Sequence, residues 1–305
     1  MKKILWMWLG MSLFLFSGCA GGGKDADVEV PFAVVTDHVG REVTVREIPE
    51  KIVSLAPSNT EIAFALGLAE QVVGVTDFCN FPPEAKTKPK VGGFADPNLE
   101  LILELGADLV LAGSLHEEFI PQLEERGIPV LVLAPASLED LYSSIVLVAE
   151  ASGKTDRGEA LVAEMKKRVE NVQTVLSALS DEEKVTVFYE VYSDPLMSVG
   201  AGTMIDEIIT LAGGNNIFGD LAEQYPQVSA EAVVERQPQV VLFPDYHGSA
   251  EIMLEQLAGR AGWQNIPALR EGRVFTVQDD LFSRPGPRVV EAIEQAAALF
   301  YPHLF

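Results

Sequence analysis

Short apolar runs alternate with amphipathic stretches along this chain of 305 residues, and the alternation predicts an α/β fold. Apolar runs of about four to eight residues are typical of buried strands, whereas apolar residues three and four positions apart are typical of helices that bury one face. After a hairpin at 31–45, strands are predicted at 51–55, 72–75, 108–111 and 129–133, and helices at 58–67, 98–105 and 117–126. Strands and helices in this order predict a mainly parallel sheet.

Two of the predicted helices carry capping signals at their starts. In the first, the Ser58 hydroxyl is expected to accept a hydrogen bond from a free helix N–H while Glu61 reaches back to the backbone. In the second, Ser137 and Asp140 form the same kind of pair and open a helix after the last strand of the series.

A long helix is predicted at 154–179, where there is no proline and no glycine after Gly158. Apolar residues recur there at helical spacing, and a helix of this length spans roughly 35–40 Å. A second series follows, with strands at 184–189, 240–243 and 273–277 and helices at 204–212, 230–236, 251–257 and 288–300. We therefore expect two α/β lobes with mainly parallel sheets, joined by one long rigid helix. The expected parts are an N-terminal lobe at 31–153, the helix at 154–180 and a C-terminal lobe at 181–305.

An internal repeat supports two similar lobes. Residues 98–116 align without gaps on 229–247, so that Glu100 matches Glu231 and His116 matches His247. Each copy holds a helix with an acid in its first turn, a break, a buried strand and a loop that ends in histidine. The alternative is that any α/β unit has this layout. Ligands of parallel sheets bind beyond the carboxyl ends of the strands, so two such lobes predict a ligand cleft.

The N-terminus has the layout of a secretory signal peptide at 1–18. Lys2 and Lys3 precede an apolar run at 4–16, which is too short to cross a bilayer core of ~30 Å. The following Gly18-Cys19-Ala20 resembles a bacterial lipobox, in which the cysteine thiol carries a diacylglycerol; an uncleaved membrane anchor is the alternative. Residues 19–30 are rich in glycine and charge and predict a flexible tether. We expect an exported protein, lipid-anchored at the outer face of the cytoplasmic membrane or in the periplasm.

Charge and composition exclude several functions. The net charge of −23 argues against nucleic-acid binding, which needs a basic surface. With Cys19 acylated, Cys79 is the one cysteine that remains, so no internal disulfide is expected. The sequence shows no Gly-x-Ser-x-Gly, no phosphate-binding glycine loop, no Cys-x-x-Cys and no clustered metal-ligand spacing among its four histidines. Catalysis is therefore the least supported class, and neither a resident cofactor nor a bare metal ion is expected.

Six segments carry a resemblance to a known family: SLAPSNTE at 54–61, VGVTDFCNFP at 73–82, NLE at 98–100, GGNNIF at 213–218, YPQVS at 225–229 and LFSRPGPR at 281–288. Over residues 35–303 the chain resembles the periplasmic substrate-binding proteins of ABC importers for corrinoids, haem and iron siderophores, the class with a single rigid helix between two lobes. Within the class it looks most like the cobalamin-binding members. The resemblance implies a monomer, not an enzyme, that captures a corrinoid and delivers it to a membrane permease; haem or an iron siderophore is the alternative ligand.

The resemblance also implies roles for individual residues. The implied ligand contacts are Ser58, Phe78, Phe94, Met197, Tyr225, Asp280 and Arg284. Phe94, Met197 and Tyr225 stand where the family's model member has larger aromatics, and Gly113 stands where it has a tryptophan. Glu100 and Glu231 would pair with arginines of the permease. Their alternative role is that of ordinary acids in a first helical turn, where the helix dipole favours them.

Three further residues lie in loops from which a ligand metal could be reached. His116, His247 and Cys79 are of the types that bind cobalt or iron above or below a macrocycle. The alternative is that the histidines are exposed loop residues and that Cys79 is a small buried thiol. A macrocycle is a flat apolar plate with a polar rim, so aromatic side chains would bury its faces at about 25 cal/mol per Å².

Overall fold

A β-hairpin begins the part of the chain that the computed structural model describes, residues 30–305. Strands β1 (Ala33–Thr36) and β2 (Glu42–Val45) pair antiparallel, as the sequence predicted. The expected signal peptide, Cys19 and the tether lie outside the described residues, apart from Val30. Over residues 30–305, no helix has both the length and the apolar character needed to cross a membrane.

The first sheet has four parallel strands in the order β4-β3-β5-β6. They are β3 (Ile52–Ser54), β4 (Val72–Val75), β5 (Leu109–Ala112) and β6 (Val130–Val132). The intervening segments are helices α1 (Pro57–Ala65), α2 (Leu99–Glu104) and α3 (Ile120–Glu124) and 3-10 turns η1 (Pro83–Thr87) and η2 (Ser114–Phe119). The helix predicted at 117–126 is thus split between a 3-10 turn and a short α-helix.

The second sheet repeats this plan, with parallel strands in the order β10-β7-β11-β12. Its strands are β7 (Thr186–Tyr189), β10 (Asn215–Asn216), β11 (Val240–Pro244) and β12 (Val274–Val277). Its helices are α6 (Met204–Leu211), α7 (Ala230–Arg236), α8 (Ala250–Ala258), α9 (Pro267–Arg270), α10 (Asp279–Phe282) and α11 (Val289–Phe300), with 3-10 turns η3 (Asp181–Glu183), η4 (Asp245–His247) and η5 (Trp263–Asn265). A small antiparallel pair, β8 (Tyr192–Ser193) and β9 (Leu196–Met197), was not predicted.

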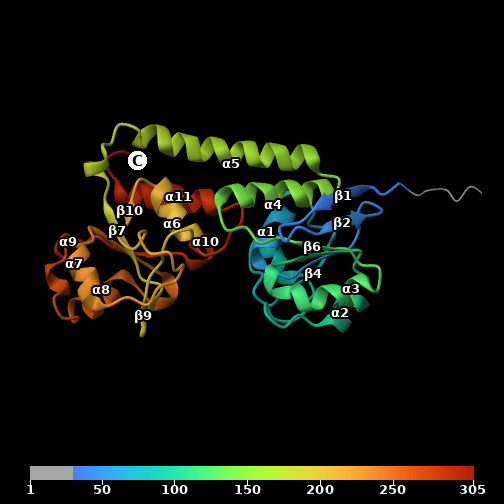
Figure 1. Cartoon of the computed structure of the whole chain (residues 1–305), viewed down its shortest axis with the longest axis horizontal. Helices are drawn as coiled ribbons and strands as arrows, with labels where there is room; N and C mark the ends of the chain where they lie inside the picture. Colours follow the sequence, from blue (N-terminus) through green and yellow to red (C-terminus); the bar gives the residue numbers. More distant parts are fainter. Residues whose placement is uncertain (1–29) are drawn as a thin grey trace, which may run out of the picture. The chain divides into compact units, whose positions relative to one another are not determined.

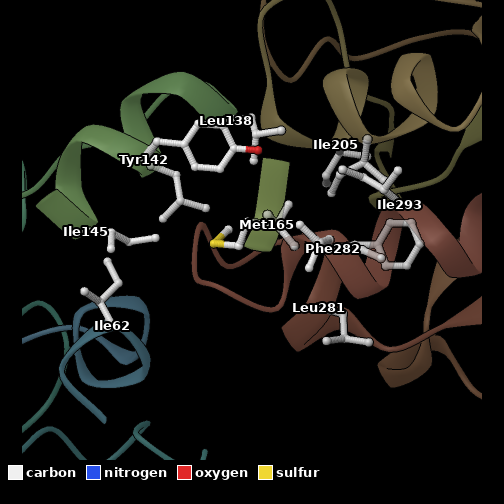
Figure 2. Packing of buried hydrophobic residues seen from close by; sticks show 14 of the residues in the cluster. Ile62, Leu138, Tyr142, Ile145, Met165, Ile205, Leu281, Phe282 and Ile293 are labelled. Atoms are coloured by element: carbon white, nitrogen blue, oxygen red, sulfur yellow. The ribbon is translucent and has the colours of Figure 1, made fainter. Parts of the chain in front are cut away.

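The long helix is α5 (Thr155–Leu176), which at 22 residues is about 33 Å long. It runs beside α4 (Leu138–Ala151) and α11, one from each half of the chain (Figure 1). Figure 2 shows Tyr142 of α4, Met165 of α5 and Ile293 of α11 within one buried cluster, together with Ile62 and Ile205. The apolar core is therefore continuous from the helices of the first sheet to those of the second. Two α/β units joined through one long helix match the expected fold class.

The two copies of the repeat occupy equivalent places. Asn98 and Ser229 cap α2 and α7 by accepting hydrogen bonds from backbone N–H groups of their first turns. The strands that follow, β5 and β11, are each third in their sheets. The Ser137 cap of α4 is also present, since its hydroxyl accepts from the Asp140 N–H at 3.1 Å.

The capping box predicted at Ser58 and Glu61 is wrong. Helix α1 starts one residue earlier, with Ala56 as N-cap and Pro57 in the first turn, where a missing N–H costs nothing. Ser58 therefore lies inside the first turn. Glu61 binds a distant arginine instead of the backbone, as described below.

Candidate functional site

A pocket of about 280 Å³ lies between loops of the first sheet and the segment that joins α10 to α11. The first-sheet side of the pocket is built from the start of α1 and from the loops that follow β4. The lining residues are Ala56, Pro57, Ser58, Phe78, Phe94, Ser283, Arg284 and Pro285. Four of the seven expected ligand contacts are thus brought together, Ser58, Phe78 and Phe94 from the first half of the chain and Arg284 from near its end.

Two phenylalanines give the pocket its apolar character. The side chains of Phe78 and Phe94 are 58% and 38% exposed, although phenylalanine is usually buried. The backbone carbonyl of Phe94 accepts a hydrogen bond from His116 Nε2 at 2.7 Å, and the two rings meet edge to face at 5.7 Å. His116 therefore positions the Phe94 loop, and the exposed rings are available to an apolar ligand.

A charged network closes one side of the pocket. Arg284 donates to Asn80 Oδ1 at 2.6 Å and pairs with Asp280 Oδ1 at the same distance. The Asn80 amide donates in turn to Asp280 Oδ2 at 2.8 Å. Asn80 was not among the expected contacts, although it belongs to the VGVTDFCNFP segment at 73–82. Asp280 and Arg284, both expected ligand contacts, therefore pair with each other, and much of their charge is satisfied within the protein.

A second ion pair, Glu61–Arg288, lies beside this network and joins α1 to the start of α11. Arg288 donates twice to the Glu61 carboxylate, at 2.8 and 2.6 Å, and its guanidinium lies 3.8 Å from the centre of the Phe81 ring. The side chains of Arg288 and Glu61 are 11% and 3% exposed. Burial raises the pKa of the Glu61 carboxyl, although Arg288 and Arg284 favour its charged form.

Met197 and Tyr225 lie on the second-sheet side of the molecule and are not among the pocket-lining residues. Met197 is half-buried in β9 and forms a β-bridge with Gln227, two positions after Tyr225. Tyr225 is exposed, and partial burial of its hydroxyl raises its pKa. The two residues therefore lie on neighbouring segments, and their contact with a ligand stays a prediction.

The three candidate metal ligands are engaged within the protein. Cys79 is buried against the hydroxyls of Thr60 and Thr76, at 3.1 and 3.2 Å from its sulfur. His116 is buried, with Nδ1 accepting from the Gly113 N–H at 2.8 Å and Nε2 donating to Phe94; burial lowers the pKa of its imidazole. His247 Nε2 lies 3.1 Å from the Val191 carbonyl. These contacts fit the alternative of a small buried thiol, whereas His116 is buried and His247 half-buried instead of exposed.

Glu100 and Glu231 are the second residues of α2 and α7 and are exposed at equivalent helix starts. Over residues 30–305, no group of three or more His, Cys, Asp or Glu side chains is arranged to hold a metal ion.

Other polar residues at the second sheet were missed. Asp245 and Tyr246 follow β11, Asp279 follows β12, and Tyr192 follows β7. All four are exposed or half-buried. The alignment of His116 with His247 marks the 245–247 turn in the sequence, but it singles out the histidine and not its neighbours.

The chain forms two parallel sheets, and segments from both halves of the chain share a pocket. One long helix packs along both halves. This arrangement defines a two-lobed ligand-binding protein. The family model described as "Periplasmic binding protein" matches residues 52–281, and the chain belongs to this family. Its fold is that of class III periplasmic binding proteins, and its relatives include proteins of the cobalamin, haem and siderophore class, as the resemblance implied.

Three similar proteins describe the family's range. An uncharacterised ABC transporter substrate-binding lipoprotein of Bacillus subtilis, YvrC, is 34% identical over all of this chain and 99% of its own length. The vitamin B12-binding protein of Vibrio campbellii is 33% identical over 82% of this chain and 89% of its own. The periplasmic haem-binding protein RhuT of Roseiflexus, solved without ligand, is 30% identical, with a TM-score of 0.73 over 84% of this chain and 99% of its own.

Proposed function

We propose that the protein captures a corrinoid in the pocket and delivers it to the permease of an ABC importer. The observation that carries this proposal is the pair of exposed rings, Phe78 and Phe94, at a pocket shared by loops from both halves of the chain. Burying a flat apolar plate against exposed aromatic rings yields roughly 25 cal/mol per Å² and costs no rearrangement of the core. Vitamin B12-binding relatives support the ligand class.

A pocket of about 280 Å³ holds one edge of such a plate. The remainder would extend toward the exposed tyrosines of the second sheet. Met197 and Tyr225 would then contribute contacts, together with Ser58 at the start of α1, where free backbone N–H groups can bind polar groups of the rim.

Haem is the second candidate ligand, because a haem-binding protein shares the fold at a similar level of identity. Titration of the detergent-solubilised protein with cyanocobalamin, haem and a ferric siderophore separates the candidates. We expect saturable binding of cyanocobalamin. Tight binding of haem without any binding of cyanocobalamin would overturn the corrinoid proposal.

The proposed site of permease docking comprises Glu100 and Glu231. Their exposed carboxylates stand at equivalent helix starts, where they can pair with arginines of a partner. The double variant Glu100→Ala/Glu231→Ala should retain ligand affinity and lose ligand uptake by cells. Glu104 and Glu235, one turn further along the same helices and also exposed, provide the matched control; their double variant should transport normally. Lost affinity in the first variant, or equal uptake by the two, would contradict the docking role.

Membrane attachment through a lipid on Cys19 completes the proposal, and the lipoprotein name of the Bacillus subtilis relative supports it. A tethered monomer needs only modest affinity for its permease, because the anchor raises the local concentration. Mass spectrometry of the mature N-terminus should find diacylglycerol on this cysteine. An unmodified thiol there would contradict the anchor.

A further inference from the structure

Three neighbouring strands of the second sheet end in polar groups at the same edge. Strand β7 ends at Tyr189, β11 is followed by Asp245, and β12 is followed by Asp279. The Asp279 N–H donates to Asp245 Oδ1 at 3.3 Å, so the last two loops touch. The carboxyl edge of a parallel sheet is where ligands bind.

The Tyr189 hydroxyl is buried at this edge without a hydrogen-bond partner among the described residues. Its side chain is 1% exposed. Burial foremost, and then nearby groups including Asp279 and Asp245, raise its pKa well above the usual value, so the hydroxyl stays protonated and can donate a hydrogen bond. A buried polar group without a partner is unfavourable, and an incoming polar group would relieve it.

Asp279 begins α10, the helix that leads from this edge to the pocket-lining residues 283–285. The Ser283 hydroxyl, which belongs to a pocket-lining residue, donates to the Asp279 backbone carbonyl at 2.8 Å. Burial, followed by the proximity of Asp280 and Asp245, raises the pKa of the Asp279 carboxyl. Among the described residues that line the pocket, Arg284 is the one cation, and it is already paired with Asp280.

The equivalent edge of the first sheet lacks this chemistry. Leu111 pairs with Ser54 and Leu131, just as Leu242 pairs with Tyr189 and Phe275. The register of these strands matches Tyr189 with Ser54 and Asp279 with Pro135. The internal repeat matches Asp245 with Ser114. The Ser54 hydroxyl is fully used, since it donates to the Ala56 carbonyl and accepts from Thr60. The acidic edge is thus particular to the second sheet.

We propose that Asp245, Asp279 and Tyr189 form a subsite for hydrogen-bond donors, which selects ligands with carboxamide side chains over ligands with carboxylates. This inference rests on the proposed function, since it assigns chemistry to one side of the same ligand. Amide N–H groups can donate to the two aspartates, and an amide oxygen can accept from the tyrosine hydroxyl. A ligand carboxylate would instead meet two carboxylates of like charge, Asp245 and the half-buried Asp279.

Two corrinoids that share a ring but differ in their side chains test the subsite. Dicyanocobinamide carries carboxamides, whereas dicyanocobyrinic acid carries carboxylates at the matching positions. In calorimetric titrations at neutral pH, the wild-type protein should bind the amide ligand at least about tenfold more tightly. The variant Asp245→Asn/Asp279→Asn should reduce this preference by about tenfold or more. Ser114→Asn, at the equivalent position of the first sheet, should leave the preference unchanged.

A second variant isolates the unpartnered hydroxyl. Tyr189→Phe should keep or raise the free energy of unfolding without ligand, yet weaken binding of dicyanocobinamide by about threefold to tenfold. If both corrinoids bind and neither variant changes the preference or the affinity, the subsite is refuted while the proposed function stands. If the wild-type protein binds neither corrinoid, the proposed function fails and the subsite fails with it.

Discussion

The two sheets share a strand order but carry different chemistry where their strands end. Loops of the first sheet present the apolar rings of Phe78 and Phe94, held in place by hydrogen bonds such as that from His116. The corresponding edge of the second sheet holds one phenol, Tyr189, and two carboxylates, Asp245 and Asp279. One scaffold used twice thus gives two unlike surfaces. Under the proposed function, this difference would favour a ligand with an apolar face and a donor-rich rim, bound in one orientation.

The largest expected effect comes from breaking the buried ion pair between Glu61 and Arg288, which joins the two halves of the chain. Arg288→Met leaves Glu61 buried without its bidentate partner and should lower the free energy of unfolding by about 3 kcal/mol or more. The matched control is Arg168→Met, since the Arg168–Glu294 pair is also bidentate but is 33% and 41% exposed. Its loss should cost about 1 kcal/mol or less. Urea unfolding measures the free energy of unfolding of both variants. Equal losses in the two variants would show that the buried pair does not hold the halves together.

The next largest effect is a loss of ligand affinity when one of the two exposed phenylalanines of the pocket is removed. Phe78→Ala and Phe94→Ala should each weaken corrinoid binding by about tenfold or more, because each exposed ring loses its contact with the plate. Phe78→Ala should leave the free energy of unfolding nearly unchanged, since that ring is mostly exposed. Leu115→Ala, an exposed apolar residue that does not line the pocket, should leave affinity unchanged. An equal loss of affinity in all three variants would place the ligand elsewhere.

The smallest effect concerns the support of Phe94 by His116. Burial lowers the pKa of His116 below its ordinary value of 6.5, so the unfolded chain binds its proton more readily than the folded one. This contribution to stability is complete above pH 6.5 and is lost as the pH falls from there through the lowered pKa. A protonated ring could no longer accept from the Gly113 N–H. Urea unfolding at about pH 7.5 and about pH 5.5 should show the decline, and His116→Gln should reduce the slope. An identical slope in the variant would contradict this role.

The sequence predicted most accurately those strands and helices that local residue patterns determine. Strand 72–75 and helix 230–236 were predicted to the residue, because each is a clear apolar run or a capped amphipathic stretch between turn signals. The two-residue strands β8, β9 and β10 and the four-residue helices α9 and α10 were missed, since such lengths hold no full period of the pattern.

Long-range chemistry was less predictable. Ser58 and Glu61 have the sequence of a capping box, but the tertiary pairing of Glu61 with Arg288 replaces the local contact. Four pocket residues could be proposed through a family resemblance, whereas Asn80 and the acidic edge could not. Their roles depend on neighbours such as Asp280, 200 positions away, and on strand register, which periodicity does not reveal.

A crystal structure of the protein with bound dicyanocobinamide would locate the ligand itself. We expect that the corrin ring contacts Phe78 and Phe94 and that its carboxamides lie within hydrogen-bonding distance of Asp245 and Asp279. A ring bound away from the pocket, for example in the groove between α4 and α5 near Tyr142 and Lys166, would contradict this expectation.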